Sequence, residues 1–289
     1  MTPVFQRQTS GSLVCPACGS LVGVRDEKCY TCGRVNPGLW GFAPLLRRLG
    51  ADLGFVPFVI GVSGTLYVLT LIASGPDSIK GGGVMSILAP SSRALLLFGA
   101  SGAFPVFSLS AWWTVLSASW LHGNLLHIVF NMMWVRDLGP STAEIVGPAR
   151  TVVIYVVAGV CGFLLSSVAG EYVSIPMLRG ANVTVGASAS IFGLLGALMH
   201  YGRKSGSSLI HAEAKRYAVI LFVFGLIMPG VDNFAHAGGF IGGYATSAFF
   251  NPLTRERGDH AIIAVACLVA TFLAIVFSIF HVLPLYRAA

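Results

Sequence analysis

Charge is what this 289-residue sequence has least of: charged residues make up 10% of it, and only 11 are acidic. Hydrophobic residues make up 55%, which is too apolar for a soluble globular fold. The 18 basic residues are scattered over several segments, so the formal net charge of +7 does not point to nucleic-acid binding. Internal repeats and low-complexity tracts are also lacking. We therefore expect an all-α polytopic membrane protein.

Seven apolar stretches carry most of the hydrophobic residues: 54–74, 116–135, 151–169, 188–201, 218–228, 233–250 and 261–280. A spanning helix needs about 20 residues, and we interpret all seven as spans although two are short. No signal peptide is expected, because the first apolar run follows a long polar segment. With the N-terminus in the cytoplasm, all but four of the 18 basic residues fall inside, as the positive-inside rule requires. The sequence predicts a multi-pass protein of a bacterial plasma membrane with its C-terminus outside.

Cysteine is scarce as well, and four of the six cysteines form two short motifs, Cys15-Pro-Ala-Cys18-Gly and Cys29-Tyr-Thr-Cys32-Gly. Each motif offers two of the four thiolates that a tetrahedral Zn(II) site uses. Two disulfides are the alternative, which a reducing cytoplasm disfavours. We predict a zinc ribbon over residues 1–36, followed by a linker over 37–53. The ribbon would have a structural role or would bind a cytoplasmic partner.

Two polar residues open apolar stretches at comparable depth. Ser188 begins the fourth stretch and His236 lies near the start of the sixth, and an ionisable residue inside a membrane is a functional-site hypothesis by default. The second, fourth and sixth spans run in the same direction, so residues early in each lie near one level. Ser188 needs a base to act as a nucleophile, and His236 is the candidate at the right depth on another helix. The pair predicts a hydrolase.

Donors for a tetrahedral oxyanion are predicted beside this pair. His127 and Asn131 are four residues apart and share a helix face, and the backbone N–H of Ser188 lies near a helix N-terminus. A metal site of His122, His127 and His236 is the rival reading. It is weaker, because five residues separate the first two histidines and no carboxylate joins them.

Neighbouring residues are expected to bring these groups together. Small residues one turn apart, Ala189 with Gly193 and Gly239 with Gly243, permit close helix approach. Phe192, one turn after Ser188, is expected under the imidazole. Asp232, four residues before His236, is interpreted as a helix N-cap rather than a third catalytic member.

Three motifs together resemble the rhomboid family of intramembrane serine proteases: His122-Gly-Asn-Leu-Leu-His127-Ile-Val-Phe-Asn131, Gly186-Ala-Ser188 and Val231-Asp-Asn-Phe-Ala-His236-Ala-Gly-Gly239. The resemblance implies a six-helix core, assigned to residues 54–252, with a seventh C-terminal transmembrane helix over 253–289. It implies a Ser188–His236 dyad, and an oxyanion site that includes His127 and Asn131. Residues with a structural role near the site are taken to be His122, Gly186, Phe192 and Gly239. It further implies cleavage of single-pass membrane proteins in or near their transmembrane segments, with no cofactor for catalysis.

Three residues depart from the family pattern, and one of them, Glu144, stands one residue later than the glutamate that usually follows Leu-Gly. Ala189 stands where a glycine usually follows the serine, so a slightly looser helix contact is expected there. Trp113 stands where many rhomboids have arginine, in the loop after the first span. The alternative function is a non-catalytic rhomboid-like protein that binds membrane clients for quality control, and such proteins typically lack the serine or the histidine. A third hypothesis makes the ribbon the input of a zinc-responsive sensor.

Overall fold

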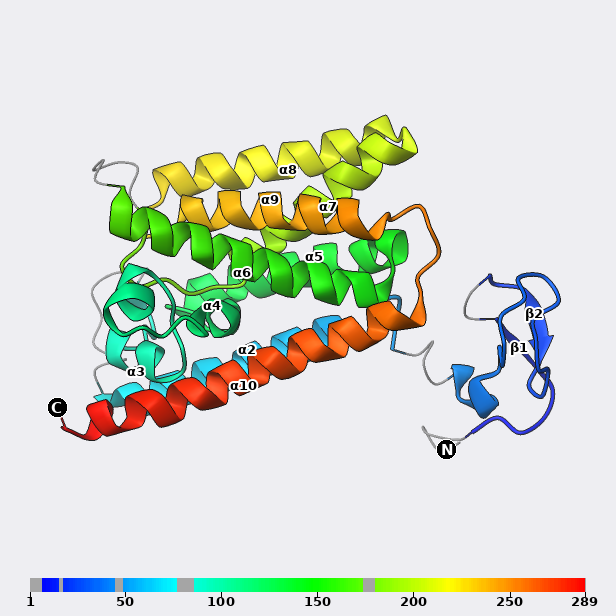
Figure 1. Ribbon diagram of the computed structural model, residues 1–289, viewed down its shortest axis with the longest axis horizontal. Coiled ribbons are helices and arrows are strands. Elements are labelled where there is room, and N and C mark those ends of the chain that lie inside the picture. The colour runs from blue at the N-terminus through cyan, green and yellow to red at the C-terminus, as the bar shows by residue number, and fades with distance from the viewer. Residues whose placement is uncertain (1–6, 16–17, 45–48, 77–85, 174–179, 289) are drawn as a thin grey trace. The chain divides into compact units, whose positions relative to one another are not determined.

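The structure is a computed structural model that describes residues 7–15, 18–44, 49–76, 86–173 and 180–288. Residues 1–6 and 16–17 of the predicted ribbon and 45–48 of the predicted linker lie outside these ranges. The chain forms two compact units, Met1–Gly54 and Phe55–Ala289. The first contains a small sheet and the second is helical (Figure 1).

The N-terminal unit is built around one short hairpin. Strands β1 (Ser12–Val14) and β2 (Leu21–Gly23) pair antiparallel, and a single 3-10 turn, η1 (Leu39–Gly41), follows. Its apolar core consists of Leu13, Cys15, Val22, Val24, Cys29 and Ala43. A core of this size needs a further staple to be stable. The start of the predicted linker packs on this unit, since Ala43 is fully buried.

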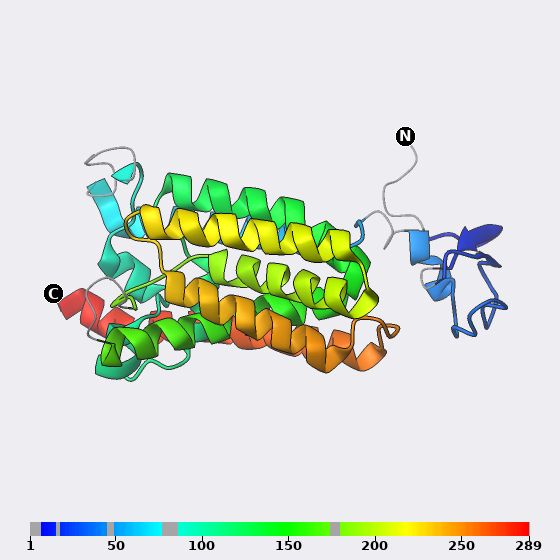
Figure 2. The same ribbon diagram turned by 90° about the horizontal axis from the view of Figure 1, so that it is seen from above.

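The second unit contains, in its described part, seven helices of 18 residues or more: α2 (Phe55–Ser74), α5 (Leu125–Val146), α6 (Pro148–Tyr172), α7 (Ser188–Ser205), α8 (Ser208–Ile227), α9 (Asn233–Phe250) and α10 (Gly258–Ala288). Four short elements lie between α2 and α5: α3 (Ser92–Leu97), the π-helix η4 (Phe104–Ser108), α4 (Thr114–Ser117) and η5 (Ala118–Trp120). The long helices run roughly alongside one another (Figures 1 and 2). The predicted all-α membrane fold is confirmed.

Among the residues that the structure describes, three helices are long and apolar enough by themselves to cross a membrane: Phe55–Ser74, Pro148–Tyr172 and Gly258–Pro284. The other long helices carry more polar or charged residues, or more glycine. Several of the polar side chains, among them Asn131, Ser190 and His236, are buried between helices, because hydrocarbon cannot satisfy their hydrogen bonds.

The helix α7 lies at the centre of the bundle, and α8 lies at its margin. Helix α7 buries 12 of its 18 residues and contacts α5, α6, α8 and α9. Helix α8 buries only Ala214, Ala218 and Gly225 of its 20 residues. A serine at the start of α7 is therefore held by protein on most sides.

The apolar stretch 116–135 is not one helix, and this part of our prediction was wrong. The chain is extended at Leu121, and α5 begins after Asn124, whose side chain accepts the backbone N–H of His127 at 2.7 Å. This N-cap stops the helix from continuing backward. His122 therefore precedes α5 instead of lying within it.

The stretch 218–228 was also misjudged, because the helix there starts ten residues earlier. Ser207 caps α8 by accepting the N–H of Ile210. The added N-terminal turns contain charged residues, among them Glu213 and Arg216, which form an exposed ion pair. Because these turns contain charged residues, a hydropathy criterion alone does not assign them to the helix.

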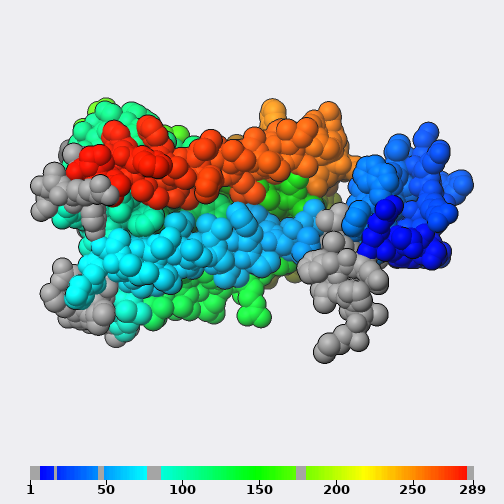
Figure 3. Space-filling view, turned by 90° about the horizontal axis from the view of Figure 1, so that it is seen from below, coloured from blue at the N-terminus to red at the C-terminus, as the bar shows by residue number. Residues whose placement is uncertain are grey.

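Helix α10 is anchored near both of its ends. At its start, the buried guanidinium of Arg150 in α6 donates to the carbonyl oxygen of Thr254 at 2.8 Å and to Nδ1 of His260 at 3.1 Å. Toward its C-terminus, the Trp113 indole donates to Ser278 Oγ at 2.9 Å. Together α10 and α2 cover much of the face seen in Figure 3. The tryptophan that replaces the family's arginine thus ties the loop before α5 to the seventh helix.

Candidate active site

Ser188 and His236 are in hydrogen-bond contact. Ser188 is the first residue of α7 and His236 is the fourth of α9. Nε2 of His236 lies 2.9 Å from the Ser188 hydroxyl oxygen. The contact predicted between the two side chains is therefore present, and its distance suits proton transfer between a nucleophile and a base.

Small residues let α7 and α9 approach this closely. A Cβ atom on Gly239 would collide with the Ala189 carbonyl, and one on Gly243 would collide with the Gly193 carbonyl. The predicted close contact through small residues is confirmed. Gly239 therefore has to remain glycine for the two helices to keep this spacing.

Ala189, the residue that departs from the family's glycine, is accommodated by α6. Its methyl group faces Gly162, where an added Cβ would lie 2.7 Å from it. Ala189 is fully buried at this point. The extra methyl thus fits because the opposite helix has no side chain there.

The imidazole of His236 is held from two sides. The Phe192 ring stacks on it with centroids 4.2 Å apart and planes inclined by 16°, as predicted. On its other edge, Nδ1 lies 3.2 Å from Oδ1 of Asn233. The sequence did not lead us to Asn233, although its i, i+3 spacing from His236 on a helix was a usable signal.

Asp232 caps α9, as expected. Its Oδ1 accepts the N–H of Ala235 at 3.0 Å, and its Oδ2 accepts a hydrogen bond from the Ser166 hydroxyl of α6. The carboxylate therefore fixes the first turn of the helix that carries His236.

His127 points an N–H toward the space beside Ser188. Its Nδ1 accepts the backbone N–H of Gly123 at 3.3 Å, which places the proton of the neutral ring on Nε2. That nitrogen would lie 2.6 Å from a Cβ on Gly186, whose φ of +131° also requires glycine. Gly186 thus opens the space into which the His127 donor projects.

Two further donors lie at this place. The Asn131 amide uses one hydrogen on the carbonyl oxygen of His127, at 2.8 Å, and has a second. The backbone N–H of Ser188 belongs to the first turn of α7, whose N–H groups have no acceptor within the helix. The arrangement can hold a developing negative charge.

His122 supports His127 and does not form a metal site with it. It is fully buried, and its ring meets the His127 ring edge to face with centroids 5.2 Å apart. Within the described ranges, the side chains close enough to hold a metal ion together are the four N-terminal cysteines. The rival three-histidine site is therefore not formed.

A cavity of about 390 Å³ opens beside the pair. Ser188, His236, His127 and Asn131 all line it. Its wall between α5 and α8 is apolar and includes Leu126, Phe130, Trp134, Ile220, Leu221 and Phe224. The cavity therefore combines an apolar wall with the Ser188–His236 pair and its neighbouring donors.

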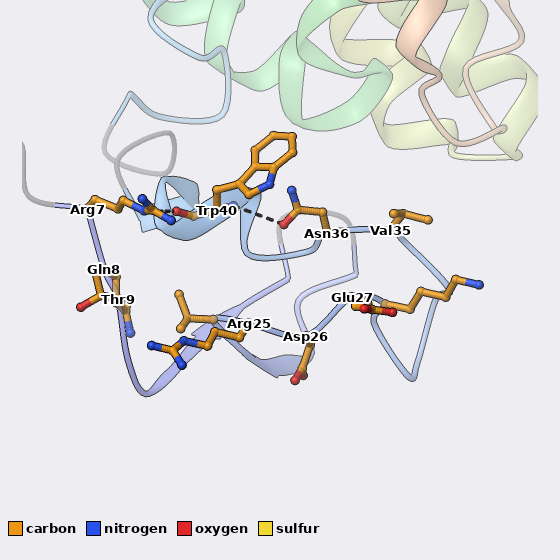
Figure 4. Close-up of a pocket in the computed structure, with 11 residues that line it drawn as sticks. Arg7, Gln8, Thr9, Arg25, Asp26, Glu27, Val35, Asn36 and Trp40 are labelled. Atoms are coloured by element: carbon orange, nitrogen blue, oxygen red, sulfur yellow. Dashed lines mark hydrogen bonds between the residues drawn. The ribbon is translucent and has the colours of Figure 1, made fainter.

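A second cavity, of about 600 Å³, lies in the N-terminal unit (Figure 4). Its lining combines Arg25 and Lys28 with Asp26 and Glu27, and the backbone N–H of Trp40 donates to Oδ1 of Asn36 at 3.2 Å. Its described lining residues include no serine, histidine or cysteine. It lacks the chemistry of the first cavity and is separate from the cysteine cluster.

The four N-terminal cysteines have the geometry of a tetrahedral thiolate site. Sγ atoms about 2.3 Å from a zinc ion lie about 3.8 Å from one another, and the Cys15–Cys32 and Cys18–Cys29 pairs are 3.8 and 3.6 Å apart. These distances are far too long for disulfides. All four ligand atoms lie within 4.8 Å of each other. The cluster can therefore hold one metal ion.

Known proteins are similar to this chain in sequence. Residues 109–253, half of the chain, match the Rhomboid domain. RHOMBOID-like protein 4 of Arabidopsis thaliana is 33% identical over 162 residues, which cover 55% of this chain and 39% of that protein. Rhomboid protease GluP of Bacillus subtilis (strain 168) is 29% identical over 179 residues, which cover 61% of this chain and 33% of that protein. The chain spans between about a third and two fifths of these two relatives' length.

Proposed function

Because this chain belongs to the rhomboid family, we propose that it is an intramembrane serine endopeptidase with Ser188 as nucleophile and His236 as general base. The observation that carries the proposal is the 2.9 Å contact between Ser188 Oγ and His236 Nε2 at the wall of a cavity. Relatives of a family need not share an activity, so the geometry of this chain carries the assignment.

In the first half of the proposed reaction, the Ser188 oxygen attacks a peptide carbonyl while its proton passes to Nε2 of His236. The oxyanion takes hydrogen bonds from His127 Nε2–H, the Asn131 amide and the Ser188 backbone N–H. The intermediate collapses, and His236 gives the proton to the leaving amine. In the second half, water attacks the acyl-enzyme carbonyl while His236 accepts its proton. The ester bond to Ser188 Oγ then breaks, His236 returns the proton to that oxygen, and the carboxylic acid product leaves.

The cavity supports membrane-protein substrates. Its wall between α5 and α8 is lined by Phe130, Trp134 and Phe224, which suit an apolar segment better than a polar one. We propose single-pass membrane proteins as substrates, cleaved in or near their transmembrane segments.

The proposed organisation follows the basic residues and the two units. We assign residues 1–36 to a cytoplasmic ribbon, 37–53 to a linker, 54–252 to the protease core and 253–289 to an added transmembrane helix. The N-terminus lies in the cytoplasm and the C-terminus outside, in a bacterial plasma membrane. A partner of the ribbon would be cytoplasmic.

We propose that Cys15, Cys18, Cys29 and Cys32 bind one structural zinc ion. Hydrogen bonds from Ser20 lower the pKa of the Cys18 thiol to about 6, which favours the thiolate that a metal needs. Purified protein should contain about one zinc per chain, measured by atomic emission. Cys15→Ser should lose most of it, whereas Cys161→Ser, in α6, should keep it. Equal zinc in both variants would contradict the assignment.

The test of the proposed function compares Ser188→Ala with Ser205→Ala, a change at the other end of α7. Purified in detergent, Ser188→Ala should neither cleave a reporter membrane substrate nor react with a fluorophosphonate. Ser205→Ala should cleave the substrate and react with the probe. Retained cleavage by Ser188→Ala would sink the proposal. A folded wild-type protein that never reacts with the probe would instead favour the non-catalytic client binder.

A further inference from the structure

We infer that Asn233 is a positioning residue that selects the reactive form of His236, an inference that rests on the proposed function. The two contacts of the imidazole are on opposite nitrogens. Nε2 meets the Ser188 hydroxyl at 2.9 Å, and Nδ1 meets Oδ1 of Asn233 at 3.2 Å. A neutral imidazole has one N–H and one bare nitrogen, so the atom facing Nδ1 decides which nitrogen can take the serine proton.

The amide oxygen is an acceptor only, and it therefore keeps the proton on Nδ1. Nε2 is then bare and able to accept from Ser188 Oγ–H. When the proton arrives, the ring becomes an imidazolium, and the hydrogen bond from Nδ1–H to Asn233 becomes charge-assisted and stronger. Asn233 would thus favour the transition state without touching the substrate.

Helix α8 packs against the amide oxygen of Asn233. Asn233 is the first residue of α9, directly after the capping residue Asp232. A Cβ atom on Gly225 of α8 would collide with the Asn233 Oδ1 atom. Gly225 is one of the three residues that α8 buries, so the sparse packing of α8 includes a contact against this amide.

Among the described residues, no charged group around the His236 ring contacts Nδ1, so the neutral amide of Asn233 is the group that accepts its hydrogen bond. His127 of α5 is the titratable group that faces His236 from another helix. Both carboxylate oxygens of Asp232 already accept hydrogen bonds, one from the Ala235 N–H and the other from the Ser166 hydroxyl. A carboxylate in place of Asn233 would add a charge at a half-buried position beside the buried imidazole, which is costly unless it is paired.

The decisive measurement is the rate of Ser188 labelling by a fluorophosphonate as a function of pH, in full-length protein. Asn233→Ala should lower this rate, and kcat for a reporter substrate, about 10- to 100-fold with little change in KM, since it removes only the orientation of the base. Asn233→Asp restores an acceptor and adds a negative charge that favours the imidazolium. It should retain more activity than Asn233→Ala and move the acid limb of the profile up by about one pH unit.

Two further variants separate positioning from structure. Asn251→Gly, at the C-cap of the same helix, should label like wild type. Gly225→Ala should slow labelling by displacing the amide, but should add little in an Asn233→Ala background, because the two changes act on one contact. If Asn233 had only a structural role, its replacement would lower the melting temperature and leave the pH profile of Ser188 labelling unchanged.

The outcomes are distinguishable from those of the proposed function. If wild type is labelled at Ser188 while folded Asn233→Ala is labelled at the same rate, the inference is overturned and the dyad survives. If Asn233→Ala does not accumulate, Asn233→Asp decides, since an unshifted profile would overturn the inference equally. If wild type itself is not labelled, the proposed function fails first, and this inference fails with it.

Discussion

Helices α7 and α9 hold two serine–histidine pairs, one at each end. Ser188 of α7 meets His236 of α9 at 2.9 Å, and farther along, His200 of α7 meets Ser247 of α9, also at 2.9 Å. His236, His200 and Ser247 are buried, whereas Ser188 is half-buried. Since the distance is the same, the distance alone does not make a reactive site.

The surroundings separate the two pairs. Ser247 lies within α9, where its backbone N–H is bonded to the preceding turn, and its hydroxyl also reaches the Ala197 carbonyl oxygen at 3.5 Å. Neither His200 nor Ser247 lines the cavity beside Ser188. The Ser188–His236 pair lies at a helix N-terminus, beside flanking donors and a cavity with room for a peptide. The His200–Ser247 pair lacks these features and only joins the two helices.

The largest expected effect comes from replacing each histidine by glutamine. His236→Gln should lower kcat/KM for a reporter substrate by about 10⁴-fold or more, because the base is lost. His200→Gln should stay within a few-fold of wild type and lower the melting temperature instead. Comparable activity losses in two folded variants would erase the contrast between the pairs.

A smaller effect is expected from the glycines at the two ends of α7. Gly186→Ala should cost about 10²- to 10³-fold in kcat, since its φ is +131° and the methyl would displace the His127 donor. Gly206, at the other end, also has a positive φ but has nothing within 4 Å of an added Cβ. Gly206→Ala should therefore lose about 1 kcal/mol of stability and no activity, as measured by kinetics and thermal melting.

The close packing of the two helices can be tested at Gly239. Gly239→Ala should push α9 from α7, lowering the free energy of unfolding by about 1–3 kcal/mol and activity about tenfold. Gly61→Ala in α2, where an added Cβ meets nothing, is the matched control and should be neutral or slightly stabilising. An unchanged melting temperature for Gly239→Ala would argue that the helix contact is looser than described.

The smallest effect belongs to the second pair. Ser247→Ala should cost about 1 kcal/mol of stability, the usual net value of one hydrogen bond, and leave labelling of Ser188 at its normal rate. A thermal melt and a labelling time course on the same sample measure both. Slower labelling would mean that the pairs communicate along the helices.

The pairing of Ser188 with His236, the stacking of Phe192 and the cap at Asp232 were predictable, because helical direction and spacing place those residues. The break before Asn124 was not, since an N-cap interrupts a run that hydropathy reads as continuous. Arg150 shows another limit. In the sequence it counts as one more cytoplasmic charge, yet it is 2% exposed and donates to carbonyls that only the folded loop before α10 brings near.

Asn233 and the His200–Ser247 pair escaped prediction for different reasons. Asn233 contacts a residue one turn away on its own helix, a spacing that the sequence does carry, whereas the His200–Ser247 contact joins two helices and a single sequence carries no sign of it. Motifs that also follow a known family pattern were easier to recognise. The catalytic roles assigned to Ser188, His236, His127 and Asn131 remain predictions until the variants are measured.

The sparse burial of α8 has a consequence for how the protein is handled. With three buried residues in 20, this helix relies on its surrounding solvent for most of its side-chain contacts, and it forms one wall of the cavity through Ile220, Leu221 and Phe224. Acyl chains and detergent tails fill that role with different lengths and stiffness. Between micelles and bilayers of increasing thickness, the turnover rate should therefore change more than the melting temperature of the α6–α7–α9 centre. The reason is that lipid or detergent surrounds the α8 wall of the cavity, and this surrounding changes with the preparation.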